Sequence, residues 1–294
     1  MTDMKCRQYC FLLLTVILMV ACDPSNHPIF PEDLFPQYEY DGETAPGTPL
    51  GYISPELIWE DEEDEGTEIT SVNVTIIGSD GHAKTLSFNS PEEVAEYIQQ
   101  LPEGEYDLLV TVNMTPEGGY ILENDVVSLL DASASPDQAF FSINHVVLKG
   151  GTVTIVECPL QRLLSRLTIN LTGEPEGTVV SVQVEHVAQN VALTQKNQDG
   201  SYGVPSETGT TVVLPGQGTL MPTAAGYSRT TICITVTVPD GRVIPITVDA
   251  PGMEMGKEYQ IDLMFSDISA DIELSTITIN DWAEGWTVNE DQTL

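Results

Sequence analysis

Short runs of alternating apolar and polar residues recur through most of this chain and constrain its fold most strongly. The segment Tyr106–Met114 is the clearest, because every second residue in it is Tyr, Leu, Val or Met. A period of two places one face of a strand toward a core and the other toward solvent. Glycine, proline, asparagine and aspartate separate these runs at short intervals. The pattern predicts an all-β protein built from sandwiches or barrels.

Runs with strand character lie on both sides of residue 159. On the N-terminal side they are Ile69–Ile77, Lys84–Phe88, Tyr106–Met114, Tyr120–Leu122, Val126–Leu130, Phe140–Leu148 and Thr152–Cys158. On the C-terminal side they are the second half of Leu160–Leu171, then Thr178–Val187, Val191–Thr194, Thr211–Leu214, Thr230–Val238, Arg242–Val248, Glu258–Phe265 and Thr276–Asp281. Turn residues predict that 69–77 pairs with 84–88, and 140–148 with 152–158, as hairpins. We therefore expect two tandem β-sandwich domains, residues 59–159 and residues 160–294.

One segment of the first domain has helical character instead. Ser90 is an N-cap residue, Pro91 suits the first helical position, and Glu93 completes a capping box. Apolar residues at helical spacing then continue to Leu101, and Pro102 follows. We expect one short helix here.

The N-terminus has the organisation of a secretory signal. Lys5 and Arg7 precede the apolar run Phe11–Ala21, and Cys22 follows. The run is too short to span a bilayer, which takes about 20 apolar residues. Its end resembles the lipobox of bacterial lipoproteins, in which the cysteine becomes the acylated N-terminus. We expect residues 1–21 to be a signal peptide and Cys22 to carry fatty acyl chains such as palmitate. The alternatives are an ordinary signal peptide cut elsewhere, or a buried strand.

Proline and acidic residues dominate residues 22–58, which we expect to be a lipidated tether to the membrane. Little regular structure is expected before Pro55, because proline-rich linkers are extended and fairly stiff. The tether is also free of basic residues. No Lys or Arg occurs between Cys22 and Lys84.

The charge of the chain excludes one class of partner. It has 10 Lys and Arg against 45 Asp and Glu, and removing residues 1–21 leaves 8 against 44, a net charge of −36. Proteins that bind nucleic acid neutralise phosphates with Lys and Arg. We expect no nucleic-acid partner, and no binding to an anionic lipid surface through charge.

Two cysteines remain in the expected mature chain besides Cys22. Cys158 and Cys233 each lie in a strand-like apolar segment. They could form one disulfide in an oxidising envelope, or remain two buried thiols that pack as small hydrophobic groups. Their spacing favours the second interpretation slightly.

The acidic run Glu60–Glu65 could be read as a calcium loop. It sets acidic residues at the first, third and fifth positions of an EF-hand-like spacing. The twelfth position is Val72, where such loops need a bidentate Glu. A solvated acidic loop is the simpler interpretation, and we expect no metal site.

No catalytic motif is present. The chain lacks the nucleophile elbow, zinc-protease, phosphate-loop and dinucleotide patterns. The histidines His27, His82, His145 and His186 have no metal-ligand spacing. Trp282 and Trp286 could stack on a sugar, but aromatic residues after a last strand more often cover the core. We expect no catalytic, cofactor-binding or metal-binding residues and no cofactor.

Three segments resemble a known family. They are LPEGEYDLLVTVN (Leu101–Asn113), RLLSRLTINL within Leu160–Leu171, and TITINDWAEG (Thr276–Gly285). With the lipobox and tether, they make the whole chain similar to the FimB-type fimbrial anchor and accessory lipoproteins of Bacteroidales. A sister group of uncharacterised surface lipoproteins shares these features.

The resemblance implies two transthyretin-like β-sandwiches carried to the outer-membrane surface. In that family, an Arg-specific protease trims stalk and tip subunits near the N-terminus, and the freed groove accepts a donor strand from the next subunit. With no Lys or Arg between Cys22 and Lys84, the chain offers that protease no site in the tether. This favours an anchor over a stalk subunit.

We hypothesise a non-enzymatic cell-surface lipoprotein that anchors, or is accessory to, a fimbria-like polymer by β-strand complementation. Strands near Thr276–Asp281, or an unpaired edge in the second domain, would contact the fimbrial subunit. The alternative is a surface lipoprotein that binds glycan or protein at loops or at Trp286. A glycan array with wild type and Trp286→Ala separates the two. An envelope hydrolase is a third class and needs carboxylates that converge in a cleft.

Overall fold

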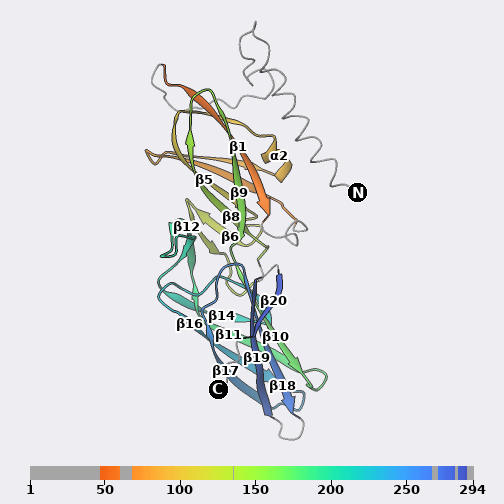
Figure 1. Cartoon of the computed structure of the whole chain (residues 1–294). Coiled ribbons are helices and arrows are strands. Elements are labelled where there is room, and N and C mark those ends of the chain that lie inside the picture. The colour runs from red at the N-terminus through yellow and green to blue at the C-terminus, as the bar shows by residue number, and fades with distance from the viewer. Residues whose placement is uncertain (1–46, 60–67, 135, 267–270, 282–283, 290–294) are drawn as a thin grey trace.

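The computed structural model describes residues 47–59, 68–134, 136–266, 271–281 and 284–289. The predicted fold class is confirmed. Nearly every element of the described residues is a β-strand, the sheets pack in a sandwich-like arrangement, and one short helix is present. The described part is elongated, with the N-terminal half above the C-terminal half in Figure 1.

A seven-stranded sheet forms most of the N-terminal half, in the order β3-β2-β5-β8-β9-β1-β4. Its strands are β1 (Leu50–Trp59), β2 (Val72–Gly78), β3 (Ala83–Phe88), β4 (Gln99–Pro102), β5 (Gly104–Val112), β8 (Phe140–Leu148) and β9 (Val153–Arg162). The expected hairpin of β2 and β3 is confirmed by a register that runs from Val72 opposite Phe88 to Ile77 opposite Ala83. In its turn Gly81 has a φ of 81°, which suits glycine.

The tether prediction was wrong for residues 50–58, because they belong to β1. This strand lies inside the sheet, parallel to β9 and antiparallel to β4. Tyr52 N donates to Thr152 O at 2.9 Å, so the N–H groups of even-numbered residues face β9. Pro55 therefore has its missing N–H on the opposite side, beyond the last β1/β4 pair at Ile53 and Gln99. Proline at this position therefore removes no hydrogen bond from the sheet. The sequence around Pro55 does not show this, because it depends on which strands β1 pairs with.

The helix prediction was right at the start and wrong at the end. Helix α2 (Pro91–Ala95) has Ser90 as its N-cap, and Glu93 N donates to the Ser90 hydroxyl at 3.4 Å. The chain then leaves the helix and forms β4, which pairs with β1. Leu101 is buried in the core from a strand and not from a helix. Leu101 pairs with Gly51, 50 residues earlier in the chain, and this distant pairing overrides the local helical spacing.

Two sheets form most of the C-terminal half. The five-stranded sheet has the order β15-β10-β18-β19-β20 and the four-stranded sheet has the order β14-β11-β16-β17. The strands are β10 (Ser165–Thr172), β11 (Val179–Ala188), β14 (Gly209–Leu214), β15 (Gln217–Leu220), β16 (Arg229–Thr237), β17 (Val243–Pro251), β18 (Lys257–Ser266), β19 (Asp271–Asp281) and β20 (Glu284–Asn289). Buried residues from both sheets, including Val182, Ile234 and Ile261, belong to one hydrophobic cluster.

The two halves share a fourth sheet. Its order is β13-β12-β7-β6, with β6 (Tyr120–Glu123), β7 (Val126–Leu129), β12 (Asn190–Lys196) and β13 (Tyr202–Pro205). Val127 of β7 lies opposite Val191 of β12, and both are fully buried. A hairpin from each half therefore contributes to one sheet.

The cores follow the same arrangement. Phe140 belongs to the cluster of the N-terminal half, whereas the next residue, Phe141, belongs to the cluster of the C-terminal half. Strand β9 also runs through residue 159 without interruption and leads directly toward β10. The predicted domain boundary between residues 159 and 160 stays a proposal. Around this boundary the two halves pack against each other.

Asn113 holds several segments of the N-terminal half together. It is buried at the end of β5 with a left-handed φ of 58°. Its Oδ1 accepts from Thr70 N at 2.9 Å. Its Nδ2 donates to Glu68 O at 2.9 Å and to Gln138 O at 3.1 Å. A buried amide with every hydrogen-bonding atom in use specifies one arrangement of its neighbours.

Candidate interaction surfaces at strand edges

Several predicted site residues lie outside the described residues. These are Cys22, the run Glu60–Glu65, His27 and Trp282. Trp286 lies within β20, a strand that the sequence did not predict. The alternation of Trp286 and Val288 is the signal that could have indicated it.

The C-terminal strands form one end of the five-stranded sheet. The predicted strand 276–281 is the second half of β19, which pairs with β18 along its whole length. Strand β20 pairs with β19 at Thr278 opposite Asn289 and at Ile279 opposite Val288. It is therefore the terminal strand of its sheet. A terminal strand presents one row of backbone groups that another strand can pair with.

Asp262 organises polar contacts on the sheet that β20 completes. Its carboxylate accepts from Asn170 Nδ2 and Gln260 Nε2 at 2.9 Å each, and from Thr276 Oγ1 at 2.8 Å. Burial acts to raise the pKa of Asp262, but these hydrogen bonds together lower it below the ordinary value. They link β10, β18 and β19 through side chains as well as backbone.

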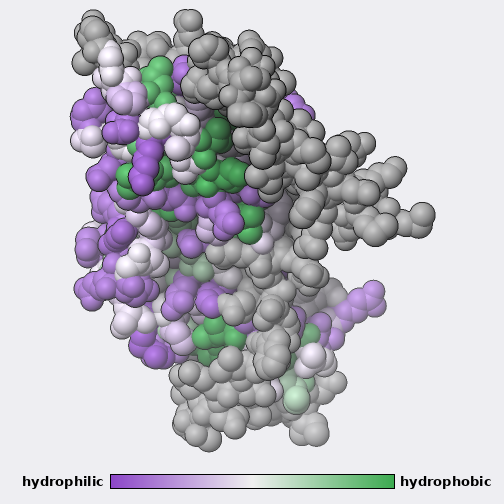
Figure 2. Space-filling view, turned by 45° about the horizontal axis from the view of Figure 1, so that its top comes forward, coloured by the Kyte–Doolittle hydropathy of each residue, from purple (hydrophilic) through white to green (hydrophobic). Residues whose placement is uncertain are grey.

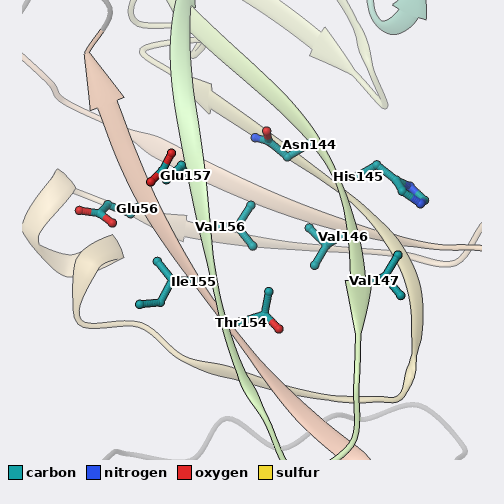
Figure 3. Close-up of a pocket in the computed structure, with 9 residues that line it drawn as sticks. All are labelled: Glu56, Asn144, His145, Val146, Val147, Thr154, Ile155, Val156 and Glu157. Atoms are coloured by element: carbon teal, nitrogen blue, oxygen red, sulfur yellow. The ribbon is translucent and has the colours of Figure 1, made fainter. Parts of the chain in front are cut away.

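Strands β8 and β9 pair at one end only, so the backbone edges that face each other are open along the rest of their length. The expected hairpin forms only in part, with Phe140 opposite Arg162 and Phe141 opposite Gln161. Toward the turn the two strands separate, because β8 continues along β5 and β9 continues along β1. A cavity of about 530 Å³ lies between them (Figure 3). Its lining comes from β1, β8 and β9 and consists of Glu56, Asn144, His145, Val146, Val147, Thr154, Ile155, Val156 and Glu157.

The ionisable groups of this cavity do not converge. Glu56 and Glu157 lie side by side in the β1/β9 register. The His145 ring points away from both carboxylates in Figure 3, and its Nδ1 lies 2.9 Å from Asp107 Oδ1. This arrangement does not bring an acid and a base to one point, as hydrolysis needs.

Neither of the other described histidines forms a ligand cluster. The described residues contain no group of three or more His, Cys, Asp or Glu that could hold a metal ion. His186 has a left-handed φ of 61° and stacks on Tyr227, with ring centroids 3.9 Å apart. His82 lies in the β2–β3 turn, where its N–H donates to Asp80 Oδ1 at 2.9 Å.

Cys158 and Cys233 are both free thiols. Cys158 is fully buried in the N-terminal core, and burial raises its pKa to about 12. Its Sγ donates to Val156 O at 3.3 Å. Cys233 is half-buried in β16 of the other half. The interpretation of two unpaired thiols agrees with this geometry.

Where it is described, one face of the molecule is mostly hydrophilic. On the face shown in Figure 2, hydrophobic residues form small patches between hydrophilic ones. No helix in the described residues is both long enough and apolar enough to cross a membrane.

A family model described as Fimbrillin-A associated anchor proteins Mfa1 and Mfa2 matches residues 36–287. The chain belongs to this Mfa2 anchor family. The match covers both halves and the shared sheet, and it confirms the resemblance drawn from the sequence. No curated protein matches the chain.

Solved structures similar to this Mfa2-family chain come from Porphyromonas gingivalis and Parabacteroides distasonis. The fimbrial anchor protein Mfa2 from Porphyromonas gingivalis has a TM-score of 0.51 and 14% identity, covering 82% of this chain and 99% of that one. The tip fimbrial protein Mfa3 from the same organism has a TM-score of 0.48 and 13% identity, covering 80% and 100%. A fimbrial assembly protein from Parabacteroides distasonis has a TM-score of 0.47 and 13% identity, covering 83% and 99%. At these identities the likeness to the P. gingivalis anchor shows the fold.

Membership of the Mfa2 family has four consequences. It indicates a role associated with fimbriae and cell adhesion, a location at the cell surface and association with other fimbrial subunits. It also points to a non-enzymatic role, because the family consists of anchor proteins.

Proposed function

We propose that this chain is a lipid-anchored, non-enzymatic base of a fimbria-like polymer at the outer-membrane surface. Cys22 carries the acyl chains, and more than one chain is needed for a stable anchor. The observation that carries the proposal is the anchor-family match over residues 36–287.

The position of β1 supports an anchor that is not trimmed. The segment from Cys22 to Ala83 contains no Lys or Arg, so an Arg-specific protease has no site there. Strand β1 lies within that segment and pairs on both sides, with β4 and β9. An untrimmed chain keeps β1 in its sheet and keeps its connection to Cys22, so it remains at the membrane.

The C-terminal strands are the proposed contact with the next subunit. Strand β20 is terminal in its sheet and pairs with β19 at a few positions. Such a strand can exchange its partner for an open groove of a neighbouring subunit, where backbone hydrogen bonds give affinity. The anchor then donates a strand and keeps its own β1.

Mass spectrometry of the protein isolated from native envelopes tests the anchoring. The expected mature N-terminus is Cys22 with an acyl mass added, and Cys22→Ser releases the protein from the membrane fraction. An unmodified Cys22 in the envelope protein would refute the anchoring.

Affinity purification from the same envelopes tests the subunit contact. A fimbrial subunit is expected to co-purify with wild type and to be lost when residues 284–294 are deleted. The matched control is Val213→Lys, a 52% exposed position on β14, which is also terminal in its sheet. Thermal unfolding verifies that each variant is folded. Continued co-purification with the folded deletion variant would contradict donation by β20.

A further inference from the structure

Two strand pairs in the described residues are parallel, and one of them joins the entry and the exit of the N-terminal half. Strand β1 is the first strand of the described chain, and β9 is the strand that leads out of this half toward β10. They pair in parallel over eight register positions, from Tyr52 opposite Val153 to Trp59 opposite Leu160. The other parallel pair is β10/β18.

Direction matters when a chain is pulled from its two ends. In an antiparallel pair of first and last strands, the entering end lies beside the leaving end, so tension opens the ladder one bond at a time. In a parallel pair the two ends lie at opposite ends of the ladder. Tension then acts along the strands and loads all the ladder bonds together.

We propose that the β1/β9 pair gives this chain a further function as a load-bearing link between the membrane and the polymer. The direction of load rests on the proposed function, in which the lipid lies before β1 and the fimbria lies beyond β9. Tension enters at Leu50 and leaves toward the C-terminal half at Arg162, which is the opposite end of the ladder.

Several contacts make β1 suited to this role. Its N-terminal part also pairs with β4 at four positions, from Leu50 opposite Pro102 to Ile53 opposite Gln99. Pro55 removes no bond to β9, because the N–H groups of even-numbered residues face that strand. The halves are also joined by three β7/β12 pairs. All the load nevertheless enters through β1, so β1 must slide past β9 before this half opens.

Single-molecule force spectroscopy on the isolated, unacylated chain tests the proposal by comparing two pulling geometries. The first uses Cys22 and Glu174→Cys, a position beyond the far end of β10, so the load passes through the β1/β9 pair in shear. The second uses Glu68→Cys and Glu174→Cys with Cys22→Ser. Asn113 Nδ2 donates to both Glu68 O and Gln138 O, and Gln138 lies just before the β8 residue that pairs with Arg162, so Glu68 lies near the end of β9. Both proteins carry Cys233→Ser, and Cys158 is fully buried.

The expected result is a several-fold higher unfolding force in the first geometry, with an extension of up to about 390 Å when residues 50–162 unravel. Equal forces in the two geometries, or a lower force in the first, would overturn the proposal. Because the isolated chain carries no lipid and no partner, this result is independent of the acylation and co-purification tests.

A pair of proline variants provides a second measurement. Glu56→Pro removes an N–H that faces β9, whereas Thr85→Pro removes one that faces outward from the terminal strand β3. Both side chains are exposed. The first variant is expected to lower the force in the Cys22 geometry, and the second to leave it unchanged. The opposite order would contradict a role for the β1/β9 ladder.

Discussion

Val127 and Val191 lie opposite each other in one sheet, although they come from different halves of the chain. Both side chains are fully buried. The sheet brings β6 and β7 from the N-terminal half against β12 and β13 from the C-terminal half. The hydrophobic cluster of the C-terminal half also contains Leu109, Tyr120 and Phe141. The two halves are therefore coupled by both backbone pairing and apolar packing.

Coupling of this kind predicts that the whole chain unfolds in one cooperative transition. Val127→Asp places a carboxylate at a fully buried position, which costs several kcal/mol, and is expected to split the calorimetric transition into two. Val179→Asp, at a 62% exposed position in β11, is the control and should change stability by less than about 0.5 kcal/mol. Two transitions in wild type would contradict the coupling.

Asn113→Asp is expected to destabilise the chain by about 3 kcal/mol near neutral pH. The change replaces an amide that donates to Glu68 O and Gln138 O with an oxygen that repels both. Urea unfolding measures the loss. Asn124→Asp is the matched control, because Asn124 has the same φ of 58° but is exposed. A similar loss in both variants would show that the backbone conformation, and not the side-chain contacts, sets the cost.

Asp262 should make stability depend on pH in acid. Its pKa is lower in the folded chain than in the unfolded chain. The stabilisation is therefore fully present above the unfolded value of about 3.9 and is lost as pH falls through the folded pKa. Asp262→Asn should reduce the decrease in unfolding free energy between about pH 6 and about pH 3. Glu174→Gln, a change in an exposed loop, serves as control, and equal decreases in wild type and Asp262→Asn would refute this role.

The two thiols should differ in reactivity. Cys158 is fully buried and burial raises its pKa to about 12, so little reactive thiolate forms at neutral pH. Mass spectrometry after iodoacetamide treatment should find Cys233 modified first in the native protein, and both modified in urea. Early modification of Cys158 would indicate that the N-terminal core opens readily.

Local patterns predicted the strands that pair with near neighbours. The β2–β3 hairpin and the turn between β16 and β17 followed from alternation and turn residues. Strand β1 was missed because Pro55 argues against a strand, and β4 because its residues continue the helical spacing after Ser90. The pairing of the two strands has no local signal. Tyr52 pairs with Val153, about a hundred residues away.

The candidate sites were also hard to predict, because they depend on strand pairing between distant parts of the chain. The strand at residues 276–281 was predicted from alternation, but the terminal position of β20 depends on the order of five strands. The cavity between β8 and β9 arises because β9 pairs with β1 in place of completing its hairpin. No pattern within residues 140–162 indicates that β9 pairs with β1 and not with β8 along most of its length.

Consecutive residues Phe140 and Phe141 face different cores. Recombination between relatives near residue 159 would therefore bring together surfaces that were never selected for one another. Exchange of both halves together avoids this mismatch. We therefore expect recombination among these anchors to exchange whole proteins and not separate halves.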